Sequence, residues 1–86
     1  MIPAQCRAAR GWLNWTQQDL AAKARVSLST VKDYEADRRT PMHNNLEAML
    51  SAFSRGGVQF TFDPAGGASG ITVNRNLAGD VPGAER

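Results

Sequence analysis

Polar and basic side chains are concentrated on one side of the stretch SLSTVKDYEADRR, residues 27–39. If this stretch forms a short helix with Val31 and Tyr34 buried, a rotation of about 100° per residue sets the direction of the other side chains. The side away from the core then carries Ser29, Lys32, Asp33 and Ala36, with Leu28 and Thr30 at its two edges. This outward surface is small, polar and slightly basic. It favours nucleic-acid binding only weakly, because a purely structural helix is also polar on its outside.

Side chains that could support catalysis or metal binding are isolated from one another in the sequence. His43 is the only histidine and Cys6 the only cysteine, and neither has a motif partner that would form a nucleophile, a general base or a metal site. The glycine-rich DPAGGASG, residues 63–70, lacks the Lys-Ser/Thr ending of a phosphate loop and is interpreted as a turn. We therefore expect no enzymatic activity, no cofactor and no metal.

Composition and charge set further bounds. The chain has 86 residues, 42% of them hydrophobic, and contains no apolar run approaching the roughly 20 residues that a membrane span requires. Its N-terminus lacks the pattern of a secretory signal, and the formal net charge is +2, with eight Lys and Arg against five Asp and Glu in residues 1–60. These features predict a soluble, cytoplasmic, mildly basic protein with no membrane partner. Its core would be small enough to favour oligomerisation.

Helical spacing and capping residues predict three helices in the first part of the chain. They cover residues 3 to about 11 or 13, 17 to about 24, and 28–36. Thr16 precedes the second helix and forms a capping-box pattern with Asp19, while Ser27 is the N-cap candidate of the third. The second and third helices are separated by a tight turn, which is a helix-turn-helix arrangement.

A fourth helix is the clearest amphipathic pattern. Its apolar positions are Leu46, Met49, Leu50 and Phe53. Asn44 or Asn45 could cap it, and Gly56 and Gly57 stop it. Beyond this helix the apolar residues alternate, which predicts a β-hairpin with strands at about 58–62 and 70–75. We divide the chain into a helical part, 1–57, a hairpin extension, 58–75, and a flexible tail, 76–86.

The segment RAARGWLNWTQQDLAAKARVSLSTVKDYEADRRTP resembles the Cro/phage-repressor, or XRE-type, helix-turn-helix family. The matching residues are Arg10, Thr16, Gln17, Leu20, Ala21, Val26, Ser27, Val31, Glu35, Arg38, Arg39 and Pro41. The resemblance covers about residues 5–56. It implies a mainly α fold, a four-helix phage-repressor-like domain followed by the hairpin, and a sequence-specific DNA-binding transcriptional regulator of the repressor or controller type.

The resemblance also implies roles for individual residues. Residues 28–36 would enter the major groove, with base readout by Ser29, Lys32 and Asp33, and with Leu28 either touching a thymine methyl group or belonging to the core. Phosphate contacts would come from Gln17, Ser27, Thr30, Arg38 and Arg39. Arg10 and Glu35 would form a structural ion pair that ties the first helix to the third.

Two positions depart from the family pattern. Arg25 and Asp37 stand where the family commonly has glycine. A left-handed backbone would cost a residue such as Arg25 about 1–2 kcal/mol, so the turn could differ slightly, whereas Asp tolerates this conformation better than most residues.

The hairpin exposes Val58, Phe60 and Phe62 unless something covers them. They could fold over the helices or pair across a dimer, and we expect a homodimer that binds a pseudo-palindromic operator in double-stranded DNA. The alternative is a protein-interaction module, such as an antitoxin or antiactivator, whose hairpin and tail bind a regulatory protein partner.

Overall fold

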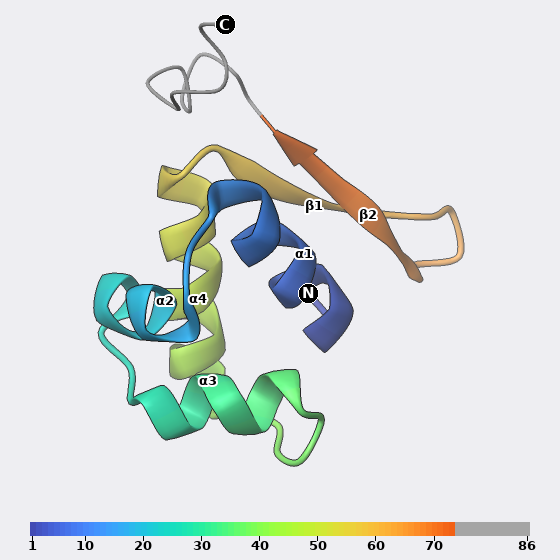
Figure 1. Cartoon of the computed structure of the whole chain (residues 1–86). Helices are drawn as coiled ribbons and strands as arrows, with labels where there is room; N and C mark the ends of the chain where they lie inside the picture. Colours follow the sequence, from blue (N-terminus) through green and yellow to red (C-terminus); the bar gives the residue numbers. More distant parts are fainter. Residues whose placement is uncertain (74–86) are drawn as a thin grey trace, which may run out of the picture.

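The computed structural model describes residues 1–73, which form four helices followed by an antiparallel hairpin (Figure 1). The elements are α1 (Pro3–Leu13), α2 (Gln17–Ala24), α3 (Leu28–Glu35), α4 (His43–Arg55), β1 (Val58–Phe62) and β2 (Ala68–Val73). This confirms the predicted mainly α fold with a C-terminal hairpin. Within residues 1–73, no helix is both long enough and apolar enough to cross a membrane.

The predicted caps set the start of α2 and α3. Thr16 Oγ1 accepts a hydrogen bond from the backbone N–H of Asp19, and Asp19 Oδ2 accepts one from the backbone N–H of Thr16, both at 2.9 Å. Ser27 Oγ accepts from the backbone N–H of Thr30 at 3.1 Å. Each cap satisfies a donor that the first turn of a helix leaves without a partner.

The prediction of an asparagine cap for α4 is wrong. The helix begins at His43, its N-cap residue is Met42, and no side chain caps it. Asn44 and Asn45 therefore lie inside the first turn. Pro41 favours extended backbone at Thr40, but nothing in the local sequence marks Met42 as the boundary.

Both positions where glycine is common in the family adopt the left-handed conformation. Arg25 ends α2 with φ 58° and ψ 43°, and Asp37 follows α3 with φ 59°. The turn between α2 and α3 thus keeps its left-handed geometry although Arg25 has a side chain.

The second strand begins two residues earlier than predicted. Asp63 Oδ1 accepts hydrogen bonds from the backbone N–H groups of Ala65 and Gly67, and the Asp63 N–H donates to the Gly67 carbonyl at 2.7 Å. This compact turn lets pairing resume at Ala68, opposite Phe62. Residues 74–75 and the predicted tail, 76–86, lie outside the described residues.

The core lies between the helices and one face of the hairpin. Its largest fully buried side chains are Phe53, Leu20, Met49, Val31, Val58 and Cys6. Phe53 stacks on Trp15 and meets the edge of Phe60, with centroid distances of 5.6 Å in both pairs. The hairpin thus folds over the helical core, while Phe62 near its tip stays 51% exposed.

Gln5 fastens the hairpin to α1. Its side chain is buried, and its Nε2 donates to the carbonyls of Thr61 at 3.1 Å and Gly70 at 2.8 Å. Its Oε1 accepts from the backbone N–H of Ile2 at 3.0 Å. One amide therefore bonds to both strands and to the start of the chain.

Candidate nucleic-acid interface

The outward face of α3 is open. Ser29 and Lys32 are exposed, and Thr30 and Asp33 are half-buried. The hairpin packs on α1 and α4 and lies on the opposite side of the molecule from α3 (Figure 1). No described part of the chain covers this face, so it is free to meet a partner.

Leu28 has a mixed position at the start of α3. It is half-buried and packs against the core, so part of its surface is used inside the protein. The remainder lies at the edge of the outward face. The two alternatives from the sequence, core residue and thymine contact, are therefore compatible at this position.

Three hydroxyl groups meet at the N-terminus of α3. Ser27 Oγ lies 2.8 Å from Thr30 Oγ1 and 3.1 Å from Ser29 Oγ. A hydroxyl can donate as well as accept, so this group can turn its hydrogens toward an anion. The positive end of the helix dipole acts at the same place.

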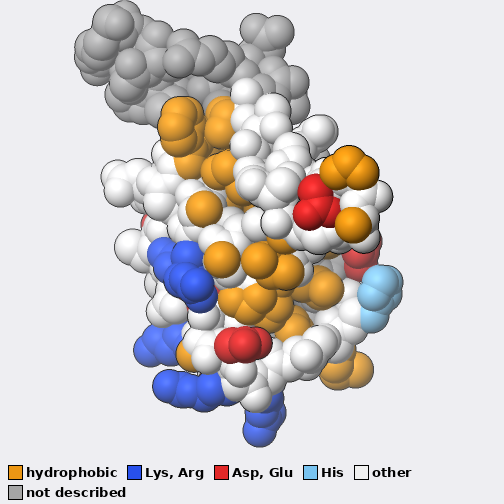
Figure 2. Space-filling model, turned by 90° about the vertical axis from the view of Figure 1, so that its right-hand side faces the viewer, with side chains coloured by type: hydrophobic (Ala, Val, Ile, Leu, Met, Phe, Trp, Pro, Cys, Tyr) orange, Lys and Arg blue, Asp and Glu red, His pale blue; other side chains and the backbone are white. Residues whose placement is uncertain are grey.

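Basic side chains flank the other end of α3. Arg38 and Arg39 are exposed in the loop that follows, and Arg38 Nη1 lies 3.6 Å from Asp33 Oδ1. Because this ion pair is open to water, its contribution to stability is between about 0 and 1 kcal/mol, and a phosphate can compete for Arg38. Figure 2 shows Lys and Arg side chains gathered on the lower part of the molecule, at the level of α3 in Figure 1.

A shallow groove of about 240 Å³ runs between α3 and the start of α4. Ser29, Thr30, Asp33, Arg39 and Asn45 are among its lining residues. The sequence suggested Asn45 only as a cap, but it shares this groove with four candidate contact residues. The sequence does contain a signal for this position of Asn45. The residue lies about one helical turn after Pro41, where the chain returns toward α3.

The predicted pair of Arg10 and Glu35 is present and holds α3 from behind. Arg10 donates through Nε and Nη2 to the two carboxylate oxygens of Glu35, each at 2.7 Å, and through Nη1 to the Trp15 carbonyl at 3.0 Å. The Arg10 side chain is 19% exposed and that of Glu35 only 3%. This two-point geometry fixes the end of α3 relative to α1.

Two further donors complete the environment of Glu35. Cys6 Sγ donates to Oε2 at 3.0 Å, and Gln17 Nε2 donates to Oε1 at 3.0 Å. The sequence offered no motif partner for Cys6, and no sequence signal pointed to a thiol donor. The carboxylate of Glu35 thus connects α1, α2 and α3.

Electrostatic interactions and hydrogen bonds keep Glu35 ionised, Arg10 protonated and the Cys6 thiol neutral. Burial raises the pKa of Glu35, but hydrogen bonds from Arg10, Cys6 and Gln17 outweigh burial, so its pKa lies below the ordinary value. The hydrogen bond to Glu35 raises the pKa of Arg10. Burial, with the neighbouring Glu35, raises the pKa of the Cys6 thiol, which therefore stays protonated and able to donate.

The position of Gln17 limits how it could contact a phosphate. Its side-chain amide donates to Glu35, so one of its two N–H donors is used in the structure. As the first residue of α2, it also presents a backbone N–H at a helix N-terminus, where anions are favoured. A phosphate contact would use this backbone group, with the side chain serving to orient the helix start.

The side chains around α3 are mostly polar and exposed. Residues 1–73 contain no group of three or more His, Cys, Asp or Glu side chains that could hold a metal ion. The accessible groups around α3 are hydroxyls, amides, cations and the carboxylate of Asp33, which are the kinds of group that proteins use to contact base edges and phosphates. The buried groups around Glu35 hold that surface in place.

Comparison with known proteins agrees with this geometry. The chain matches the family model described as Helix-turn-helix over residues 7–56, which is more than half of its length. No curated protein matches the chain. Proteins of the matched family are DNA-binding transcription regulators and are generally not enzymes. From the four helices, the left-handed turn before α3 and this match, the chain belongs to the XRE-type, Cro- and phage-repressor-like helix-turn-helix family.

Proposed function

We propose that the protein is a sequence-specific transcriptional regulator of the repressor or controller type, which places α3 in the major groove of double-stranded DNA. The observation that carries this proposal is the open outward face of α3, held from behind by the buried Glu35 cluster. The major groove is about 12 Å wide and admits a helix. A rigid support behind an exposed polar helix face is what groove readout requires.

The contacts divide into two kinds. Ser29, Lys32 and Asp33 lie on the outward face of α3 and would meet base edges, with Asn45 at the border of the same groove. Ser27, Thr30, Arg38, Arg39 and the start of α2 at Gln17 surround that face and would meet phosphates. Sequence preference would therefore depend on the first group, and affinity for any duplex mainly on the second.

We further propose that the regulator acts as a homodimer on a pseudo-palindromic operator. Phe62 is 51% exposed near the hairpin tip and Ile2 is 45% exposed at the start of α1. Figure 2 shows hydrophobic side chains at the surface on the face that looks toward the hairpin tip. A second copy that covers this surface would bring two α3 helices to half-sites about 34 Å apart.

The division of contacts can be tested by measuring duplex affinity as a function of salt for Lys32→Ala and Arg39→Ala. Both residues are exposed cations, so each variant is the matched control of the other. Lys32→Ala should change which sequences are preferred, whereas Arg39→Ala should weaken all duplexes alike and reduce the salt slope by about 0.9. Equal effects of the two variants on preference and on slope would contradict the assignment.

Absence of duplex binding at low salt by the folded protein would overturn the proposal itself. Tight complex formation with a protein partner, without DNA binding, would then favour the antitoxin or antiactivator alternative. The exposed Phe62 and Ile2 side chains would be the first candidates for that contact.

A further inference from the structure

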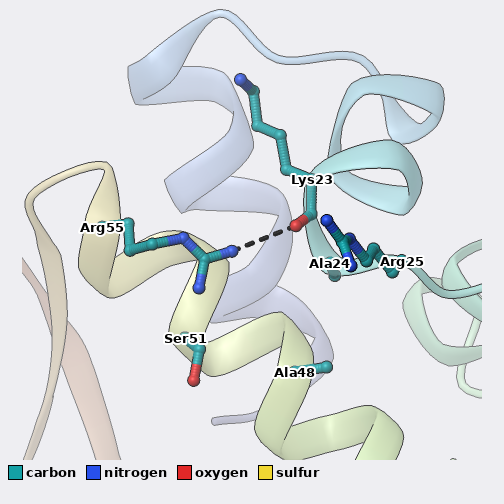
Figure 3. A pocket seen from close by; sticks show the side chains of 6 residues that line it. All are labelled: Lys23, Ala24, Arg25, Ala48, Ser51 and Arg55. Carbon is teal, nitrogen blue, oxygen red and sulfur yellow. Dashed lines mark hydrogen bonds between the residues drawn. The ribbon is translucent and has the colours of Figure 1, made fainter.

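A second pocket lies away from the outward face of α3, between the end of α2 and the middle of α4. Its volume is about 400 Å³, within the roughly 300–1,000 Å³ of ligand sites in proteins. Its lining consists of Lys23, Ala24, Arg25, Ala48, Ser51 and Arg55 (Figure 3). The lining residues thus include three with cationic side chains, one with a hydroxyl group and two alanines, and none with a carboxylate.

Contacts hold two of the three cationic side chains, those of Arg55 and Lys23, and neither contact is with a carboxylate. Arg55 Nη2 donates to the Lys23 carbonyl at 3.1 Å, which fixes the guanidinium at the pocket while its Nη1 and Nε donors are left for other contacts. The Lys23 ammonium lies 5.0 Å from the centre of the Trp15 ring, and Figure 3 shows the Lys23 side chain extending away from Arg25 and Arg55. Within residues 1–73, neither Arg25 nor Arg55 forms an ion pair with a carboxylate.

The geometry points to a binding site for a phosphate group in this pocket, contacted by the guanidinium groups of Arg25 and Arg55. A phosphate has several acceptor oxygens, and planar guanidinium groups pair with it through two parallel hydrogen bonds. The lining suits a charged ligand better than an apolar one, since only Ala24 and Ala48 are apolar. Binding would offset the mutual repulsion of the two guanidinium groups.

The position of Arg25 connects the pocket to α3. Arg25 ends α2 in the left-handed conformation, and Ser27, two residues later, caps α3. A phosphate bound by Arg25 therefore touches the turn that sets the start of the outward helix. The phosphate could come from the DNA backbone beside the operator or from a free phosphorylated molecule, and only the first source rests on the proposed function.

The site itself is tested by titrating the full chain with inorganic phosphate and with pyrophosphate while recording backbone amide resonances. We expect saturable shifts at residues 24–26, 51 and 55, and an affinity at least tenfold weaker for Arg25→Gly and for Arg55→Gln. Glycine suits the left-handed turn, so Arg25→Gly removes the cation without straining the fold. Asp37→Gly is the matched control, because Asp37 also has a left-handed backbone and follows a helix of the helix-turn-helix unit. This variant should bind phosphate and pyrophosphate as tightly as the unchanged protein does.

Shifts that do not saturate, or equal affinities for all four proteins, would overturn the inference. This result is independent of DNA, so it remains readable if the proposed function fails.

A second measurement separates the two sources by using the duplex. If the phosphate belongs to DNA, Arg25→Gly lowers the salt slope of duplex binding by about 0.9, and pyrophosphate no longer shifts the pocket amides once the duplex is bound. If it belongs to a free molecule, the slope is unchanged and pyrophosphate binds equally well to the complex. Either pattern supports a phosphate site. The site is contradicted if pyrophosphate binds neither the free protein nor the DNA complex and Arg25→Gly leaves the salt slope unchanged.

Discussion

Glu35 is the residue on which the position of α3 depends most. It receives hydrogen bonds from Arg10, Cys6 and Gln17, which come from α1 and α2. Replacing it by glutamine leaves the Arg10 charge without its partner. We expect Glu35→Gln to lower the free energy of unfolding by about 3 kcal/mol, at the low end for a broken buried pair because Arg10 is 19% exposed. Chemical denaturation measures this, and Glu47→Gln on the exposed face of α4 is the control that should change it little.

The same carboxylate predicts how stability responds to acid. The pKa of Glu35 in the folded protein is below its ordinary value of 4.5, so the folded state binds a proton less readily than the unfolded state. The stabilisation is therefore fully present above about pH 4.5 and is lost as the pH falls through the folded-state value. Asp19 acts in the same direction, because the backbone hydrogen bond from Thr16 lowers its pKa.

Denaturation between pH 6 and about pH 3 should show this decline, and Glu47→Gln should retain it. A free energy of unfolding that stays constant or rises over this range would show that the cluster does not hold Glu35 ionised.

At Arg25 we expect a substitution to stabilise the folded protein, unlike the substitution of Glu35. Its φ of 58° costs a residue with a side chain about 1–2 kcal/mol, and glycine avoids that cost while losing some stability to a more flexible unfolded chain. We expect Arg25→Gly to raise the free energy of unfolding by about 1 kcal/mol. Asp37→Gly at φ 59° should gain less, because Asp tolerates this region better. A loss of stability in Arg25→Gly would mean that the Arg25 side chain makes stabilising contacts that exceed the backbone cost.

At the scale of elements, strand β1 of the hairpin has one phenylalanine that packs in the core and another that lies at the surface. Phe60 contacts Phe53 in the core, whereas Phe62 near the tip is 51% exposed. Phe60→Ala should lower the free energy of unfolding by about 2 kcal/mol, less than a fully buried phenylalanine because Phe60 is half-buried. Phe62→Ala should change it by less than about 1 kcal/mol but weaken self-association, which analytical ultracentrifugation of both variants would measure. A dimer whose dissociation constant is the same with and without the Phe62 ring would exclude the hairpin tip as its interface.

The helices were predictable from sequence because their signals are local. Thr16 and Ser27 each cap a helix within three residues, and the spacing of Leu46, Met49 and Phe53 follows one helix face. The start of α4 was missed because no side chain caps it, and β2 was misplaced because the hydrogen bonds of Asp63 close the turn early.

At the scale of the whole molecule, the contacts that complete the site join residues far apart in the chain. The family pattern indicated the pair of Arg10 and Glu35, but the donors Cys6 and Gln17 meet that carboxylate only after three helices have packed. The anchoring of the hairpin by Gln5 and the basic pocket between α2 and α4 have the same origin. Periodicity gives the direction in which a side chain leaves its own helix, and only packing determines which other side chain it meets.

The central claim, that the outward face of α3 reads DNA sequence, is tested most directly by selecting bound duplexes from a random library with the full chain. The account predicts enrichment of one motif made of two inverted half-sites with centres about one helical turn apart, and a different motif for Lys32→Ala. A folded protein that enriches no motif over the starting library would contradict it.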